Sequence, residues 1–255
     1  MVRRYSEGAQ LSILITGAAS GIGAATARRL SRNMRVIVAD IDVSKAKKVV
    51  SEIAEFGGNA HAVELDVTDG NAVVEVVERE AHIEPISSLF CNAGINIRKR
   101  LTELSLAEWQ TVFSVHVKGA FLCAKAVIPL MAARRSGSVL IMSSDYAIMG
   151  MPAAPAYAAA KTALYSLTKS LALEFASFGV RVNALGPGPI DTPLLRGGRS
   201  GAEWNLAEQR LIAGIPLGRL GLADEVAATA EFLLSERAAY ITGQILHPNG
   251  GQTTW

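Results

Sequence analysis

The sequence lacks the features that mark secreted, disulfide-linked or nucleic-acid-binding proteins. Two cysteines in 255 residues are too few for a disulfide framework and favour a reducing compartment. The formal net charge is +2 and no long block of like charge is present, so nothing indicates a polyanionic partner. No apolar run long enough for a signal peptide follows the N-terminal arginines, and the most apolar later stretch is broken by Lys125 and Pro129 and is too short to span a bilayer. We expect a cytoplasmic protein that binds neither nucleic acid nor membrane.

What is abundant is apolar sequence, at 50% of the residues, which is enough for one sizeable core. Short apolar runs alternate with longer helical patterns. The patterns predict strands at 11–16, 35–40, 61–65, 87–91, 138–143, 180–185 and 244–247, and helices at 22–33, 43–56, 70–81, 105–134 (with a bend at Pro129), 156–177 and 223–235. This alternation implies right-handed crossovers and a parallel sheet covered by helices on both faces. We expect a single α/β domain over residues 1–255.

One segment breaks this regularity. Residues 187–215 begin with three prolines and continue into a stretch rich in glycine and arginine. A long irregular segment in a compact domain is more often functional than accidental. We expect a lid over the substrate at about 189–215, with a plain surface excursion as the alternative.

A glycine-rich turn joins the first predicted strand to the first predicted helix. Gly17, Gly21 and Gly23 would allow a tight turn, and the helix beyond offers free N–H groups to a pyrophosphate. The spacing G-x-x-x-G-x-G differs from the G-x-G-x-x-G fingerprint, and such glycines also serve close packing of a helix on a strand. The position at the first strand–helix junction favours a dinucleotide site.

Asp40 ends the second predicted strand. A carboxylate there can accept hydrogen bonds from the hydroxyls of an adenosine ribose and would repel the 2′-phosphate of NADP. The alternative is that Asp40 caps the next segment beside Asp42. We expect NAD as the cofactor.

Tyr157 and Lys161 lie four residues apart in an Ala-rich helical stretch, so they share one helix face. A nearby ammonium would lower the pKa of the phenol and fit it for proton transfer. Ser144 follows a predicted strand, where its hydroxyl could donate to a substrate oxygen. Each feature alone also occurs by chance in ordinary helices and turns.

Together these residues resemble the short-chain dehydrogenase/reductase family, of the classical type, from about Leu11 to Gly251. The resemblance implies a three-layer, doubly wound Rossmann-like fold with a seven-stranded parallel sheet, a bound dinucleotide and a homotetramer. It implies that Ser144, Tyr157 and Lys161 are catalytic and that Lys161 also holds the nicotinamide ribose. The positions it implies for cofactor binding, with Asp40, are Gly17, Ser20, Gly21, Ile22, Gly23, Asp66, Val67, Asn92, Ala93, Gly94, Tyr157, Lys161, Pro187, Gly188, Ile190 and Thr192. No metal is expected.

One position departs from the family pattern. His116 stands where the family usually has an asparagine that holds a water in the proton relay. Imidazole can donate and accept, and it titrates near neutral pH. We expect His116 either to take over the relay, as a fourth catalytic residue, or to be structural.

The substrate is the least determined part. The loop Ile95–Arg100, with Arg196 and Arg199, is basic, which favours an acidic or polyhydroxy substrate or is simply a solvated surface. Asp145 and Tyr146 are expected to form a polar, aromatic wall suited to a polyol. We expect an alcohol/carbonyl oxidoreductase acting on a sugar, a polyol or a small secondary alcohol. The alternatives are a 3-ketoacyl-(acyl-carrier-protein) reductase and a non-catalytic dinucleotide-binding sensor.

Overall fold

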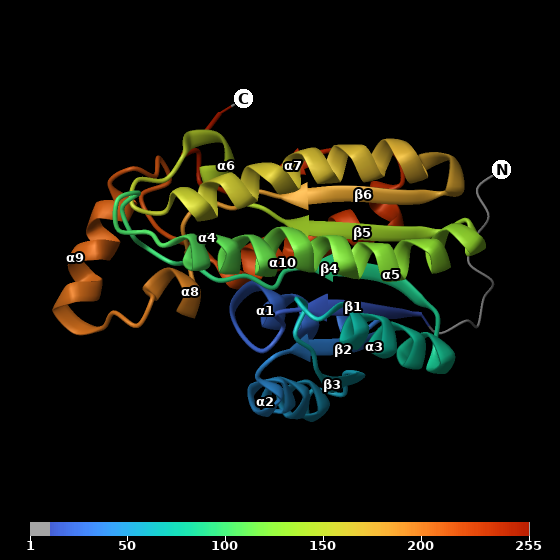
Figure 1. Cartoon of the computed structure of the whole chain (residues 1–255). Coiled ribbons are helices and arrows are strands. Elements are labelled where there is room, and N and C mark those ends of the chain that lie inside the picture. Colours follow the sequence, from blue (N-terminus) through green and yellow to red (C-terminus); the bar gives the residue numbers. More distant parts are fainter. Residues whose placement is uncertain (1–10, 255) are drawn as a thin grey trace.

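The computed structural model describes residues 11–254 and contains the expected parallel sheet (Figure 1). Its seven strands run in the order β3-β2-β1-β4-β5-β6-β9, and every pair is parallel. The strands are β1 (Ser12–Thr16), β2 (Arg35–Asp40), β3 (Ala60–Glu64), β4 (Ile86–Cys91), β5 (Gly137–Met142), β6 (Val180–Leu185) and β9 (Ile245–Leu246). The predicted seven-stranded sheet is confirmed, and each predicted strand matches an observed one to within one residue at either end.

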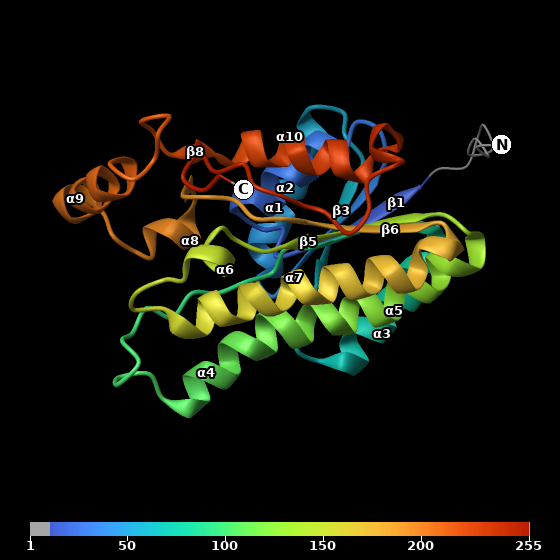
Figure 2. The ribbon, with the colours of Figure 1, turned by 90° about the horizontal axis from the view of Figure 1, so that it is seen from above.

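Helices cover both faces of the sheet, so the fold has three layers and is Rossmann-like (Figure 2). One face carries α3 (Gly70–Ile83), α5 (Gly119–Arg134) and α7 (Pro155–Phe175), and the other carries α1 (Gly21–Leu30), α2 (Val43–Glu55) and α10 (Ala223–Leu234). Single 3₁₀ turns follow α7 and α10, at Ala176–Phe178 and Glu236–Ala238. Because β1, β4 and β5 are buried along their whole length, their apolar residues run continuously rather than alternating.

The long helix predicted at 105–134 is divided, but not at Pro129. It consists of α4 (Leu106–Phe113), a π-helical segment (Ser114–Lys118) and α5, and Pro129 lies inside α5. A π segment widens the helix by a residue and redirects the side chains it carries, and such segments often occur at functional sites. His116 is one of its five residues.

The helical run Leu106–Arg134 has 29 residues and is long and apolar enough, by length and composition alone, to cross a membrane. This run is longer than the short apolar stretch considered from the sequence. In the fold it is a core helix, because the side chains of Cys123, Val127 and Met131 on α5 are buried in the main hydrophobic cluster. Cys91 and Cys123 are both buried free thiols.

The segment expected to be irregular, 187–215, contains regular structure. It holds β7 (Ile190–Asp191), α8 (Pro193–Arg196) and α9 (Gly201–Ile212), and β7 pairs with β8 (Gly221–Leu222) further along the chain. The prolines and glycines of this segment made these short elements unpredictable from the sequence. Thr192 caps α8, and Trp204 of α9 packs in a small hydrophobic cluster with Ile215 and Leu220. Both helices lie beyond the carboxyl ends of the strands, as Figures 1 and 2 show.

Candidate active site

A cleft of about 390 Å³ opens at the carboxyl ends of the strands, where α/β sheets of this kind bind ligands. It brings together residues that are far apart in the sequence. Of the residues expected to act in catalysis or cofactor binding, those on its wall are Gly17, Ser20, Gly21, Ile22, Asp40, Asp66, Val67, Asn92, Ala93, Gly94, His116, Ser144, Tyr157, Lys161, Pro187, Gly188, Ile190 and Thr192. Gly23 alone is not on the wall, because it packs beneath the turn.

The glycine turn is shaped to admit a dinucleotide. Gly17 and Gly21 have φ of 64° and 53°, which favours glycine, and a Cβ on Gly23 would lie 2.5 Å from the carbonyl oxygen of Gly17. The side-chain amide of Asn92 donates to the carbonyl oxygens of Thr16 and Gly17 over 3.1 and 2.9 Å. Ser20, the residue before α1, makes no side-chain cap bond, so the first N–H groups of the helix stay available to a pyrophosphate.

Asp40 lies beside this turn. One of its carboxylate oxygens accepts from the N–H of Ala19 over 2.9 Å, and the other accepts from the N–H of Asp42 over 3.0 Å. The carboxylate is thus fixed at the end of β2. The basic side chains on the cleft wall are Arg98, His116 and Lys161, which gather around Tyr157 rather than Asp40.

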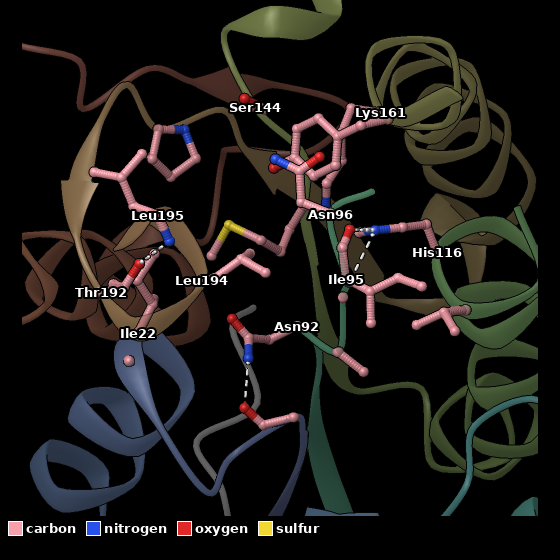
Figure 3. Close-up of a pocket in the computed structure, with 18 of the residues that line it drawn as sticks. Ile22, Asn92, Ile95, Asn96, His116, Ser144, Lys161, Thr192, Leu194 and Leu195 are labelled. Atoms are coloured by element: carbon pink, nitrogen blue, oxygen red, sulfur yellow. Dashed lines mark hydrogen bonds between the residues drawn. The ribbon is translucent and has the colours of Figure 1, made fainter. Parts of the chain in front are cut away.

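Tyr157 and Lys161 come from α7, and Ser144 follows β5, so two neighbouring elements supply the three expected catalytic side chains. The Nζ atom of Lys161 lies 5.5 Å from the centre of the Tyr157 ring and donates to the carbonyl oxygen of Met142 over 2.7 Å. Figure 3 shows Ser144 and Lys161 near the same end of the cleft.

The ionisation of this pair differs from the sequence expectation. Burial lowers the pKa of Lys161 to about 7 and raises the pKa of Tyr157 to about 12, while a hydrogen bond with Ser144 opposes the rise at Tyr157. Burial of the phenol, rather than the neighbouring Lys161, therefore determines the direction in which the pKa of Tyr157 shifts. Because both groups are buried in a region of low dielectric constant, a positive charge bound nearby would lower the pKa of Tyr157 strongly.

His116 is held against the loop after β4 (Figure 3). Its Nε2 atom lies 2.7 Å from the carbonyl oxygen and 3.1 Å from the N–H of Ile95, and its ring meets that of Tyr157 edge-on at 5.4 Å. Burial, with the charge of Lys161, lowers the pKa of His116 to about 3, so the expected titration near neutral pH is wrong. Its Nδ1 atom is buried without a hydrogen-bond partner in the described chain.

Asp145 does not form a wall of the cleft, as the sequence suggested; only its neighbour Tyr146 does. Asp145 is fully buried behind Ser144, whose hydroxyl donates to it over 3.2 Å. Its second carboxylate oxygen has no hydrogen-bond partner, and burial raises the pKa of Asp145 to about 6. The proton of the Ser144 hydroxyl is therefore drawn to Asp145 when that group is ionised.

Two supporting residues escaped the sequence reasoning. The hydroxyl of Tyr165 lies 3.1 Å from the carbonyl oxygen of Ser144 and 3.2 Å from Nε2 of His247, and Nδ1 of His247 lies 3.1 Å from the carbonyl oxygen of Gly186. This chain of contacts ties the backbone at Ser144 to the end of β9. Tyr165 lies two helical turns after Tyr157 on the same helix, and this spacing could have predicted that both tyrosines face the site.

Comparison with known proteins agrees with this geometry. A family model described as Enoyl-(Acyl carrier protein) reductase matches residues 17–253. The chain is 37% identical over 243 residues to a cis-4-hydroxycyclohexanecarboxylate dehydrogenase from Sinomonas cyclohexanicum, covering 94% of this chain and 95% of that one. It is 39% identical over 242 residues to a 3-oxoacyl-[acyl-carrier-protein] reductase from Synechocystis, covering 93% and 95%.

A solved structure is also similar. It is a protein from Beutenbergia cavernae assigned as an NAD(P)-dependent gluconate 5-dehydrogenase, with NADP bound at low occupancy. The two superpose with a TM-score of 0.89 at 34% identity, over 96% of this chain and 97% of that one. Fold, site and relatives define an oxidoreductase that uses a nicotinamide dinucleotide. The chain belongs to the short-chain dehydrogenase/reductase family.

The buried carboxyl of Asp145 predicts a pH-dependent stability. Because its folded-state pKa is raised above the unfolded value, the cost of burying it is absent at low pH and appears as pH rises through about 6. Asp145→Asn removes this titration. Relative to wild type, its free energy of unfolding should rise by up to about 3 kcal/mol between about pH 4 and pH 8.

Urea unfolding at a series of pH values measures this difference. Glu75→Gln, on the exposed face of α3, is the matched control and should show no such trend. A difference that stays constant with pH would mean that Asp145 is not buried as a carboxyl with a raised pKa.

Proposed function

We propose that this protein is an NAD-dependent oxidoreductase that interconverts a secondary alcohol and its ketone by hydride transfer. The observation that carries the proposal is the meeting of Ser144, Tyr157 and Lys161 on the wall of the cleft that also holds the glycine turn. A phenol, a hydroxyl and an amine at one end of the cleft can provide proton transfer next to a hydride acceptor.

In the oxidation direction, Tyr157 first gives up its own proton to the relay and then, as the phenolate, takes the hydroxyl proton of the alcohol, while hydride leaves the carbon that bears that hydroxyl. The nicotinamide, when bound, supplies the hydride acceptor and a positive charge. Ser144 donates a hydrogen bond to the substrate oxygen. To do so, its hydroxyl must first break the hydrogen bond that it donates to Asp145. Lys161 holds the nicotinamide ribose and favours the phenolate.

His116 is proposed as the polar group of the proton relay in place of the usual asparagine. It acts as a neutral imidazole, with Nε2 engaged by Ile95 and Nδ1 left without a partner. Such a nitrogen can bind a water molecule near Lys161, because the charge of Lys161 acts on the His116 ring.

NAD is the proposed cofactor because Asp40 is fixed where an adenosine ribose would lie. In this proposal the wall residues Asp66, Val67, Asn92, Ala93 and Gly94 contact the adenosine half of the cofactor, and Pro187, Gly188, Ile190 and Thr192 contact the nicotinamide half. The solved structure from Beutenbergia cavernae holds NADP, so the preference between NAD and NADP is a property to measure.

For the substrate we propose a sugar, polyol or other small hydroxy compound. Two relatives are named for substrates that carry a secondary hydroxyl, cis-4-hydroxycyclohexanecarboxylate and gluconate. The segment 189–215, with α8 and α9, is proposed as the lid over this substrate, and Leu194 and Leu195 of α8 already lie on the cleft wall (Figure 3). We further propose a cytoplasmic homotetramer.

A second candidate is reduction of a 3-oxoacyl-(acyl-carrier-protein), as one relative is named for that activity. That activity more often goes with NADP, so the fixed carboxylate of Asp40 favours the first candidate. A non-catalytic sensor would bind the dinucleotide tightly and turn over no alcohol or ketone. A reduced-nicotinamide absorbance screen across polyols, sugars, steroids and acyl thioesters separates the three.

Tyr157→Phe tests the acid–base role. Loss of the phenolic hydroxyl should lower kcat by about a thousandfold and leave NAD affinity nearly unchanged. Steady-state kinetics and calorimetry measure the two effects, with Tyr240→Phe, at a fully exposed tyrosine, as the matched control. Retention of most of the activity would show that another group transfers the proton.

Asp40→Ala tests the cofactor choice. Without the carboxylate, the 2′-phosphate is no longer repelled, and the ratio of kcat/KM for NAD to that for NADP should fall at least about tenfold. Asp69→Ala, at the cap of α3 and away from the cleft, should leave the ratio unchanged. A variant that still rejects NADP would remove Asp40 from the ribose site.

His116→Phe and His116→Asn test the relay. Phenylalanine keeps the ring volume without polar atoms and should lower kcat by roughly ten- to a hundredfold, whereas asparagine should retain most of it. Because the histidine is neutral above about pH 5, neither variant should move the acid limb of the pH–rate profile. Equal kcat in wild type and His116→Phe would make the residue structural.

A further inference from the structure

Arg98 lies on the cleft wall without a counterion. It belongs to the loop after β4, and between residues 11 and 254 it makes no hydrogen bond and no ion pair. Its neighbour Lys99, by contrast, is paired with Glu108. Burial lowers the pKa of Arg98, the charge of Arg199 adds to this, and the hydroxyls of Tyr146 and Tyr157 act in the other direction. Arg98 is therefore placed within electrostatic reach of the tyrosine that we assign to proton transfer.

Arg199 lies between α8 and α9 and is not itself on the cleft wall, but its charge acts on Arg98. Its Nε and Nη2 atoms donate to the carbonyl oxygens of Arg196 and Leu195 over 2.8 and 2.7 Å, and its guanidinium stacks at 5.6 Å on the ring of Trp204. These contacts fix the position of Arg199 without neutralising its charge. Arg196 is different, because both its Nε and Nη2 atoms bind the carboxylate of Asp191.

Arg98 and Arg199 thus come from separate segments and act on each other electrostatically, and neither pairs with a carboxylate among residues 11–254. Like charges repel, and an anion bound near both would reduce the repulsion and gain two attractions. The planar fork of a guanidinium matches the two oxygens of a carboxylate. Asp145 does not serve as that anion, because it is fully buried behind Ser144, accepts a hydrogen bond from the Ser144 hydroxyl and is not on the cleft wall.

We propose that Arg98, assisted by Arg199, binds the carboxylate of a hydroxy-acid substrate whose hydroxyl lies at Tyr157. This inference rests on the proposed function, and it narrows the substrate class to small secondary alcohols that carry a carboxylate, together with the matching keto acids. Arg199 lies in the proposed lid, so the same carboxylate joins the lid to the loop after β4. Arg98 and Arg199 are thereby specificity-determining residues.

The kinetic test compares an acidic alcohol with a neutral one of the same shape. The substrates are cis-4-hydroxycyclohexanecarboxylate and cis-4-methylcyclohexanol, each measured with wild type, Arg98→Met and Arg199→Met. We expect Arg98→Met to lower kcat/KM for the acid by roughly ten- to a hundredfold, and to leave that for the neutral alcohol within about threefold. Arg199→Met should act in the same sense and more weakly.

Arg100→Met is the matched control, because Arg100 is exposed on the same loop and is not on the cleft wall. It should leave both values unchanged. Equal losses for the acid and the neutral alcohol in Arg98→Met, or no loss for either, would overturn the carboxylate site. A matching loss in Arg100→Met would indicate a general effect of surface charge and would also overturn it.

A binding measurement separates this inference from the proposed function. Calorimetry of cyclohexanecarboxylate and of its neutral isostere cyclohexanecarboxamide, with the protein saturated with NADH, requires no turnover. We expect wild type to bind the carboxylate at least about tenfold more tightly, and Arg98→Met to lose that preference.

Such a preference without oxidation of either alcohol would support the anion site and refute the proposed reaction. Equal affinities, or no measurable binding of either compound, would overturn the anion site. Competition by inorganic phosphate with the same Arg98 dependence would identify phosphate, not carboxylate, as the anion.

Discussion

The hydroxyl of Thr16 joins the two halves of the sheet where the cleft begins. It accepts hydrogen bonds from the N–H groups of Asn92 and Ala93 over 3.1 and 3.2 Å, so the end of β1 is fixed to the segment that leaves β4. The crossover from β1 runs over one face of the sheet, and the crossover into β4 runs over the other. Together with the side-chain amide of Asn92, which donates to the carbonyl oxygens of Thr16 and Gly17, this contact fixes the glycine turn to the segment that follows β4.

Burial without full neutralisation is the second constraint on the site. Lys161 is stripped of water and donates to a carbonyl, Asp145 has one unpartnered oxygen, and His116 is kept neutral with an unpartnered nitrogen. Each of these polar groups costs folding free energy that a solvated group would not. All three lie around Ser144 and Tyr157, and such a cluster of buried, incompletely neutralised groups is typical of a site where a bound ligand changes the protonation of the side chains.

The sequence was sufficient for the positions of the strands and for most members of the cleft, and the reason is that both depend on local patterns. Continuous apolar runs identify strands buried on both faces, and motif residues at strand ends necessarily gather at one edge of a parallel sheet. The widening of the helix around His116 was not predictable, because a single extra residue in a turn hardly alters an apolar period. The burial of Asp145 and the raised pKa of Tyr157 were missed because both depend on packing by distant segments, which no local spacing records.

The link from Ser144 through Tyr165 to His247 has a consequence for how the protein matures. β9 is a two-residue strand at the edge of the sheet, and β6 is the strand with which it pairs. During synthesis the glycine turn, Ser144 and Tyr157 all emerge long before residue 247. The backbone of Ser144 therefore lacks this outer support until residue 247 has been synthesised and has joined the sheet. A product truncated before β9 would contain the glycine turn but would lack the outer support of Ser144.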